Sequence, residues 1–330
     1  MIPPLISVIL PIYNAGLFVN ESIQSILNQT FIDFELILIN DGSTDNSEEI
    51  ILAFQDERIR YYKNATNLKL IDTLNLGLEL AQGKYVARID ADDIANPERF
   101  QIQVDFLEAN PTYGIVGSFA RKFGDSNDLL SYVEEDENIR YAFLTHNPFI
   151  HSTVMLRSSI LKKYNLYFQN NRMHVEDYDL WMRLLQFSKG KILSQELIRY
   201  RLHAGQISTI YAKLQNENTR KLQEAYCFSL GFSELESELI IKLLSKQEEK
   251  IDKLVFAFSN ANYLSLKLPF ITLQSSFFNL IQKSVKDLIL NKTSLSIVDL
   301  FYLIRIFTFF TTKQQIGILK KIVFPLKEKI

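Results

Sequence analysis

The sequence predicts an α/β protein with a mostly parallel sheet covered by helices on both faces, followed by an α-helical C-terminal module. Three observations lead to this prediction. Short apolar runs alternate with helical patterns through the first hundred residues, which is typical of βαβ units. Polar clusters directly follow the predicted strands, where α/β sheets bind ligands. Beyond residue 210 a helical period dominates, with few breakers.

Four strand and helix pairs are expected in order along the first part of the chain. Each predicted strand is a short, mostly apolar run, and each predicted helix repeats apolar positions three or four residues apart. The pairs are Ile6–Ile12 with Val19–Leu27, Phe34–Ile39 with Asp45–Phe54, Ile59–Tyr62 with Leu70–Ala81, and Tyr85–Ile89 with Pro97–Leu107. Further strands are expected near Ile115–Ser118 and Thr153–Leu156, and a helix over Tyr178–Phe187.

Charge is divided unevenly along the 330 residues. Residues 1–210 carry 19 Lys and Arg against 27 Asp and Glu, whereas residues 211–330 carry 17 against 11. We therefore expect two domains with different tasks, one over 1–210 that holds the sheet and a helical one over 211–330. Because the whole chain is slightly acidic, with a formal net charge of -2, we expect no nucleic-acid partner.

The cysteine content and the N-terminus favour a cytoplasmic protein. A single cysteine, Cys227, excludes an internal disulfide and a cysteine-based metal cluster, and we expect it to be a small buried residue. The start of the chain lacks the basic and apolar pattern of a secretory signal. The most apolar window, Ser294–Thr312, contains Asp299 and Arg305, so we do not predict a transmembrane helix there.

The most informative motif is the acidic run that ends the fourth predicted strand, Asp90-Ala91-Asp92-Asp93. Side chains two residues apart in an extended chain point the same way, so Asp90 and Asp92 can face one divalent cation. Carboxylate oxygens suit Mg²⁺ or Mn²⁺, and Mg²⁺ shares its ligands with substrate phosphates. A calcium-binding EF-hand loop is excluded, because Ala95 and Gln101 stand where it needs Gly and Glu.

A second polar motif, Asn40-Asp41-Gly42-Ser43, follows the second predicted strand and opens a helix. Gly42 permits the tight turn, and Ser43 or Asp45 can cap the helix. Helix capping explains the residues from Gly42 onward but does not explain an aspartate at position 41. Its carboxylate can accept the imide N–H of a uracil or thymine ring, so Asp41 is a candidate for reading a nucleotide base.

Together with three further segments, these motifs resemble the family 2 glycosyltransferases of the GT-A fold, of the type that builds bacterial cell-surface glycans. The similarity covers roughly residues 5–208 in the family's order and spacing. The segments that carry the similarity are Pro11-Ile12-Tyr13-Asn14, the Asp41 motif, Asn67 with Asn75 and Gly77, the acidic run, and His174-Val175-Glu176-Asp177-Tyr178-Asp179-Leu180-Trp181. One departure is Lys69, where many relatives have glycine.

The resemblance implies a glycosyltransferase of the hexosyl type that uses a nucleotide-sugar donor, most simply a UDP-sugar, and Mn²⁺ or Mg²⁺. It implies metal binding by Asp92 and Asp90, with His203 close to the metal or diphosphate. It implies a catalytic base within the pair Glu176 and Asp177. The nucleotide contacts that it implies are Pro11, Tyr13, Asn14, Asp41, Asn67, Arg88, Asp90 and Ala91.

Elementary chemistry agrees with these implications. Breaking a sugar–diphosphate bond leaves negative charge on the nucleotide, which a bound metal can neutralise. Only the attacking hydroxyl then needs to lose a proton, so one carboxylate suffices. We expect Asp177 to be this base, because the dipole at a helix N-terminus favours its ionised form. Asp179 is turned away by the helical geometry, and we expect it to be structural.

The expected acceptor is a hydroxyl of a cell-surface glycan or of a lipid-linked saccharide. Residues 313–330 hold five lysines and one glutamate among apolar residues, a basic amphipathic pattern that can lie on the anionic cytoplasmic face of a membrane. A helix that closes a domain core and a homodimer contact explain this pattern equally well.

The same motifs argue against two other enzyme classes. A nucleotidyltransferase would have a glycine-rich basic loop where Pro11-Ile12-Tyr13-Asn14 stands, and a phosphatase with an aspartyl nucleophile would have its acidic pair after the first strand. The remaining alternative is a catalytically inactive glycosyltransferase-like scaffold in a glycan assembly complex. Retention of Asp90, Asp92 and Asp177 argues against it.

Overall fold

The computed structural model describes residues 3–203, 205–229, 234, 237 and 241. The chain divides into two compact units, residues 1–142 with 147–219 and residues 143–146 with 220–330. In the described part of the second unit, the rings of Phe143 and Tyr226 pack edge to face with centroids 6.0 Å apart. The window Ser294–Thr312, the tail 313–330 and most of the predicted helical domain lie outside the described residues.

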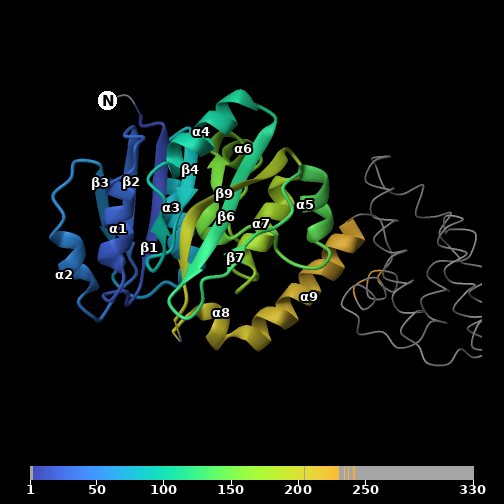
Figure 1. Ribbon diagram of the computed structural model, residues 1–330. Helices are drawn as coiled ribbons and strands as arrows, with labels where there is room; N and C mark the ends of the chain where they lie inside the picture. The colour runs from blue at the N-terminus through green and yellow to red at the C-terminus, as the bar shows by residue number, and fades with distance from the viewer. Residues whose placement is uncertain (1–2, 204, 230–233, 235–236, 238–240, 242–330) are drawn as a thin grey trace, which may run out of the picture. The chain divides into compact units, whose positions relative to one another are not determined.

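The first unit is built on a sheet that contains, within the described residues, nine strands in the order β3-β2-β1-β4-β8-β6-β9-β5, with β7 paired to β6. Figure 1 shows the blue strands β1 to β3 at one side of this sheet and β6 and β9 beyond β4. The strands are β1 Ile6–Ile12, β2 Phe34–Asn40, β3 Ile59–Lys63, β4 Tyr85–Arg88, β5 Ile94–Ala95, β6 Tyr113–Phe123, β7 Leu129–Leu130, β8 Met155–Arg157 and β9 Lys189–Arg201.

The two halves of the sheet differ in strand direction. Strands β1 to β4 pair in parallel, as the sequence predicts. Beyond them, β8 is antiparallel to β4 and β6, whereas β6 and β9 are parallel with several register shifts. Strand β9 has 13 residues and was not predicted, because its apolar residues come in pairs between polar ones and follow neither strand nor helix periodicity. The long ladder with β6 decides its conformation.

Helices cover both faces of the parallel half (Figure 1). They are α1 Val19–Leu27, α2 Ser47–Leu52, α3 Leu70–Leu80, α4 Arg99–Ala109, α5 Asp136–Ala142, the 3₁₀ helix η1 His151–Thr153, α6 Ser158–Lys163, α7 Glu176–Leu184, α8 Ile207–Ile210 and α9 Ala212–Ser229. Alternate residues of β1 share a core with α1 and α4. On the other face Ile9 lies under Gly77 of α3, where an added Cβ would sit 2.6 Å from the Ile9 side chain.

Helix α7 begins two residues earlier than predicted and ends three residues earlier. Glu176 and Asp177 are therefore its first two residues rather than residues that precede it. Cys227 lies buried in α9, as expected, and burial raises the pKa of its thiol to about 12. None of the helices in the described part of the chain is both long and apolar enough to cross a membrane.

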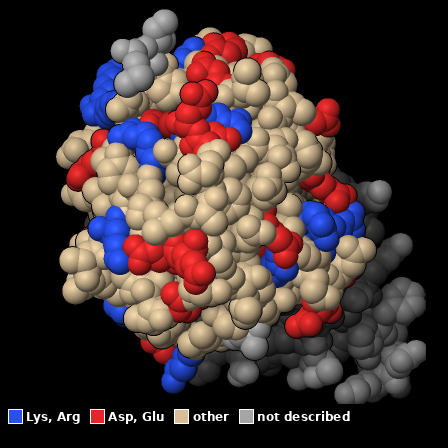
Figure 2. Space-filling view, turned by 90° about the vertical axis from the view of Figure 1, so that its left-hand side faces the viewer, with Lys and Arg blue, Asp and Glu red and all other residues tan. Residues whose placement is uncertain are grey.

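The face on the side of β3 and α2 carries small groups of mixed charge with uncharged surface between them (Figure 2). Two ion pairs that involve β3 show how charges are paired there, one with α2 and one with the buried Glu35 of β2. The Lys63 ammonium donates to Glu48 at 2.7 Å, and the Arg60 guanidinium contacts Glu35. Such pairing leaves no field of one sign over these two elements.

Candidate active site

Three neighbouring parallel strands deliver the predicted site residues to one edge of the sheet. Strand β1 ends at Ile12 and leads to Tyr13 and Asn14, β2 leads to Asp41, and β4 leads to the acidic run. The carboxyl ends of parallel strands meet at the same edge, so these segments lie together although up to eighty residues separate them in sequence.

The segment after β1 is tied to the loop after β2. The Asn14 side-chain oxygen accepts the Thr44 backbone N–H at 2.8 Å, and the Asn14 backbone N–H donates to the Ser43 hydroxyl at 3.0 Å. Tyr13 keeps half of its side chain exposed beside this junction, and Pro11 is partly exposed. The arrangement leaves an aromatic ring open to a ligand at the end of β1.

Asp41 is almost fully buried and accepts three hydrogen bonds. Its Oδ1 accepts from the Asn64 amide and the Leu68 backbone N–H, each at 2.8 Å, and its Oδ2 accepts from the Lys69 backbone N–H at 3.0 Å. The Asn67 side-chain oxygen also accepts from Lys69, at 2.8 Å. An ionised carboxylate has about four acceptor positions, so Asp41 organises this loop and retains capacity for one more donor.

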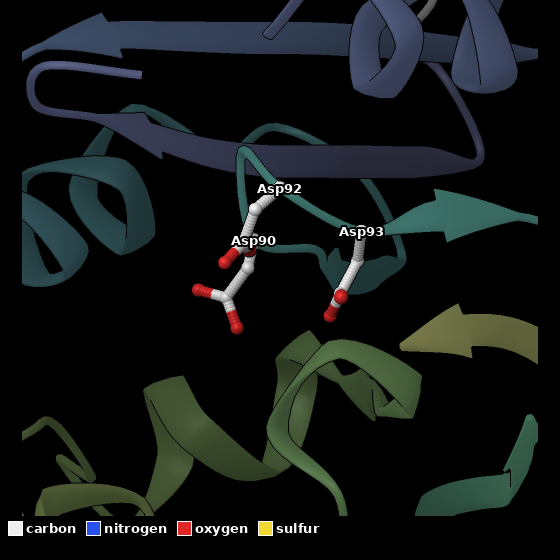
Figure 3. Close-up of side chains that lie close together, drawn as sticks. All are labelled: Asp90, Asp92 and Asp93. Atoms are coloured by element: carbon white, nitrogen blue, oxygen red, sulfur yellow. The ribbon is translucent and has the colours of Figure 1, made fainter. Parts of the chain in front are cut away.

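The acidic run forms a cluster of three carboxylates rather than two. Asp90 and Asp92 project to the same side, and Asp93 lies beside them (Figure 3). One ligand oxygen from each lies within 4.8 Å of the others. Asp93 is fully buried: its Oδ1 accepts the Arg201 backbone N–H at 2.9 Å, while its Oδ2 has no hydrogen-bond partner among the described residues.

These carboxylates fit a divalent cation. Burial, and then the charges of Asp90 and Asp92, raise the pKa of Asp93 well above its ordinary value. A buried carboxylate oxygen without a donor is stabilised by a cation, and three oxygen ligands suit Mg²⁺ or Mn²⁺. The sequence predicted Asp90 and Asp92 as ligands but not Asp93, because an alternating strand would turn residue 93 away.

His203 approaches this cluster from the end of β9. Its Nε2 lies 2.9 Å from Asp92 Oδ2, and its ring packs against Phe18 with centroids 4.7 Å apart. Burial and the charge of Asp90 raise the pKa of Asp92, and the His203 contact opposes that rise. The structure therefore brings His203 to the predicted metal ligands.

Arg88 occupies the other side of Asp90. It is buried, and both of its terminal nitrogens contact the Asp90 carboxylate. Ser152 completes the contact, because its hydroxyl donates to Asp90 Oδ2 at 2.9 Å and accepts the Asp90 backbone N–H at 3.1 Å. The predicted contact of Arg88 with a diphosphate would compete with this ion pair.

Asp177 faces the same region from the start of α7. Its Oδ2 accepts from the Asn147 amide at 2.9 Å and lies 3.9 Å from His151 Nδ1. Burial raises the pKa of Asp177 to about 6, the charge of Arg88 lowers it, and the charge of Asp90 raises it further. Asp177 therefore lies within electrostatic reach of the acidic cluster, and 17% of its side chain remains exposed to a substrate.

Glu176 is the more deeply buried of the two acids. Burial, and then the charge of Asp177, raise the pKa of Glu176 to about 7. Interacting acids titrate as a pair, so the raised pKa values belong to Glu176 and Asp177 together. Asp177 is the better placed of the two to accept a proton, because its side chain is the more exposed and receives the Asn147 hydrogen bond. Asp179 instead pairs with Arg172 at 3.1 Å and Arg183 at 2.7 Å, which fits the structural role expected from the sequence.

The segment from Asn147 to Thr153 links the two halves of the site. From the sequence, His151 before Ser152-Thr153 resembles a family pattern near the acceptor side, but Asn147 and the contact of Ser152 with Asp90 were not predicted. Asn147 contacts Asp177, and Ser152 contacts Asp90. Neither residue type carries a chemical signal of its own, and no periodicity marks the segment. At Asn147 itself the local sign is the Asn-Pro step at 147–148, which favours a turn.

Comparison with known proteins places the chain in a family. The model of the family described as glycosyl transferase family 2 matches residues 7–165. An uncharacterized glycosyltransferase of Haemophilus influenzae is 37% identical over 240 residues, which is 67% of this chain and 72% of that protein. The Escherichia coli protein WfgD, a UDP-Glc:alpha-D-GlcNAc-diphosphoundecaprenol beta-1,3-glucosyltransferase, is 29% identical over 208 residues, or 62% of this chain and 80% of its own.

The fold has a solved counterpart. The crystal structure of Staphylococcus aureus TarS 1–349 in complex with UDP-GlcNAc matches with a TM-score of 0.59 and 19% identity, over 95% of this chain and 88% of that one. The sheet with its flanking helices is the GT-A fold of glycosyltransferases. The chain belongs to glycosyl transferase family 2 and is a glycosyltransferase, so the family resemblance found in its motifs is confirmed.

Proposed function

We propose that the protein is an inverting, metal-dependent glycosyltransferase that moves one sugar from a UDP-sugar to a hydroxyl of a bacterial cell-surface glycan or a lipid-linked saccharide. The observation that carries the proposal is the placement of Asp177. It lies close enough to Arg88 and Asp90 for their charges to act on it, while the acidic cluster lies at the ends of the nucleotide-binding strands. The names of the TarS complex and of WfgD support UDP-sugars as donors.

The nucleotide would lie along the ends of β1, β2 and β4. Tyr13 offers an exposed ring to the base, and Asp41 Oδ2, which accepts one hydrogen bond from Lys69, retains acceptor capacity for the imide N–H of uracil. Asn14 and Asn67 hold the two loops on either side of that position. Pro11 and Ala91 lie at partly exposed backbone positions beside them and complete the proposed nucleotide contacts.

Asp92, Asp90 and His203 would hold Mn²⁺ or Mg²⁺, together with Asp93. A divalent ion there would offset the negative charge that develops on the diphosphate as the sugar leaves. Arg88 keeps Asp90 oriented through its paired contact, and Ser152 adds a hydrogen bond to the same carboxylate. Supporting contacts of this kind fix the direction of a metal ligand.

The transfer itself needs one proton acceptor. Asp177 takes the proton of the acceptor hydroxyl, whose oxygen forms a bond to the anomeric carbon while the bond from that carbon to the diphosphate oxygen breaks. The electron pair of the broken bond leaves with UDP. Because the attack is a single displacement from the opposite face, the anomeric configuration inverts. Glu176 is more deeply buried than Asp177 and is therefore less accessible to an acceptor hydroxyl.

The lipid-linked acceptor is supported by the name of WfgD, which acts on a diphosphoundecaprenol-linked sugar. A protein that uses such an acceptor works at the cytoplasmic face of a membrane. We therefore propose a cytoplasmic protein with peripheral membrane contact, a catalytic domain over 1–210 and a helical domain over 211–330 that meets the membrane, the acceptor or a second copy.

Two measurements test the proposal. Transfer from a panel of nucleotide sugars, with and without Mn²⁺ or Mg²⁺, should show turnover with a UDP-sugar that a chelator abolishes. Calorimetry with UDP should show metal-dependent binding that Asp92→Ala removes and Asp177→Ala retains, although both variants lose transfer. Binding of UDP without turnover on any acceptor would favour the inactive scaffold instead.

A further inference from the structure

We propose that Asn147 is a positioning residue for the reaction: its amide holds the Asp177 carboxylate in place and in the ionised form that accepts a proton. The inference rests on the proposed role of Asp177 and extends it to a residue that touches no substrate. Three features of the segment Asn147–Thr153 carry it.

The first feature is the orientation of the Asn147 amide. Its Oδ1 accepts the Phe149 backbone N–H at 3.1 Å, and its Nδ2 donates to Asp177 Oδ2 at 2.9 Å. The oxygen and nitrogen of an amide can be exchanged in assignment, but here only one choice satisfies both contacts. The reversed amide would set an oxygen against a carboxylate and an N–H₂ against an N–H.

The second feature is that the segment cannot shift freely. Phe149 is buried, and its ring packs edge to face on Trp181 of α7 with centroids 6.4 Å apart. The Thr153 backbone N–H donates to the Ile150 carbonyl at 2.9 Å as η1 begins. The segment is therefore packed on the same helix that carries Asp177, which is what a positioning contact needs.

The third feature is the set of charges that face Asp177. Glu176 lies next to it on α7, Asp90 acts from the end of β4, and Arg88 is the cation within reach. His151 is neutral at neutral pH, because burial and Arg88 hold its pKa well below the ordinary value, and at 3.9 Å it is beyond hydrogen-bond distance. Among the described residues, Asn147 is thus the side chain that donates a hydrogen bond to this carboxylate.

A hydrogen bond to the charged form of an acid favours that form. Burial and acidic neighbours disfavour the ionised form of Asp177, and the Asn147 hydrogen bond offsets part of this effect. Without the Asn147 donor, that offset is lost. Asp177 then stays protonated to higher pH, and less of the enzyme carries an active base. The defect should therefore depend on pH, whereas a defect of packing alone should not.

The test is the pH profile of kcat/KM for Asn147→Ala, measured with a UDP-sugar and saturating metal between about pH 5.5 and about pH 8.5. The acidic limb of the profile should move up by about one pH unit. At pH values below the limb, kcat/KM should then be roughly tenfold lower than in the wild type, and above pH 8 it should change little. Asn147→Asp, which has nearly the same volume, should move the limb further, because a second carboxylate then faces Asp177.

Asn110→Ala is the matched control. It also removes a side-chain amide donor, but one that bonds the Phe106 carbonyl at 2.8 Å, so the profile should keep its wild-type shape. An equal loss at every pH, or no loss, in the Asn147 variants would overturn the inference. If Asn147→Ala does not fold, Asn147→Asp decides alone. Full turnover of Asp177→Asn would instead overturn the base assignment, so the two failures are distinguishable.

Discussion

Two buried aspartates at opposite sides of the site have opposite surroundings. Asp41, after β2, accepts hydrogen bonds from one side-chain amide and two backbone N–H groups. Asp177, at the start of α7, receives one side-chain bond and one bond from the adjacent backbone, and it has acidic neighbours. Several donors let the Asp41 carboxylate organise its loop, whereas burial and acidic neighbours raise the pKa of Asp177 and its few donors keep it ionised near neutral pH.

The same substitution at the two positions should therefore give different results. Asp177→Asn should lower kcat by about 10²–10⁴-fold, because a positioned base contributes that much to a proton transfer. Its affinity for UDP in the presence of Mn²⁺ should stay within about twofold of the wild type, since the proposed nucleotide contacts do not include Asp177. Steady-state kinetics and calorimetry measure the two effects. A parallel loss of UDP affinity would show that the two sides are not separable.

Asp41→Asn should lower both the free energy of unfolding and the affinity for UDP. An amide cannot accept from Asn64, Leu68 and Lys69 as a carboxylate does, and one of these donors would face an N–H₂ group. The expected cost is about 2–3 kcal/mol of unfolding free energy, with weaker UDP binding. Chemical denaturation and UDP titration provide the measurements. Unchanged stability would mean that the three hydrogen bonds to Asp41 contribute little to the free energy of unfolding.

Asp177→Asn should instead raise the free energy of unfolding, and the size of this gain should depend on pH. The folded state raises the pKa of Asp177 from 3.8 to about 6, so it binds more protons than the unfolded state between these values. Stability from this group then falls as pH rises from about 4 to about 6 and stays lowered above that. The variant should gain about 1–2 kcal/mol at pH 7.5 and nothing below about pH 4.

Denaturation at several pH values checks this expectation, with Asp41→Asn as the comparison. A gain that is independent of pH would point to repacking rather than to removal of a buried charge. A loss at pH 7.5 would mean that the Asn147 bond stabilises the ionised carboxylate more than burial disfavours it.

The smallest expected effect concerns Lys69, in the loop that Asp41 organises. Its backbone has φ 75° and ψ 164°, a region that glycine adopts freely and other residues adopt at a cost. Lys69→Gly should therefore raise the unfolding free energy by about 1 kcal/mol and leave the bonds to Asp41 in place. Thermal unfolding would show the gain; Asp72→Gly, inside α3, should be destabilising instead.

The sequence predicted the parallel half of the fold well for a physical reason. Strands β1, β2 and β4 are buried between helices, so their apolar runs stand out, and polar residues directly after them mark the ligand-binding edge. Strand β3, at the edge of the sheet, is only partly buried. The predicted strand Ile6–Ile12 and helix Val19–Leu27 match the observed bounds. The alternation of side chains along a strand likewise placed Asp90 and Asp92 on one side.

The sequence by itself thus determined the α/β fold of the first half, the edge of the sheet that carries the site, and the family. Local periodicity and strand ends are properties of short segments. Only the tertiary structure decided that Asp93 joins the acidic cluster, that Asp41 binds a loop, and that Asn147 and Ser152 connect Asp177 with Asp90. These contacts join residues up to about one hundred positions apart through irregular backbone, where no local pattern constrains which side chains meet.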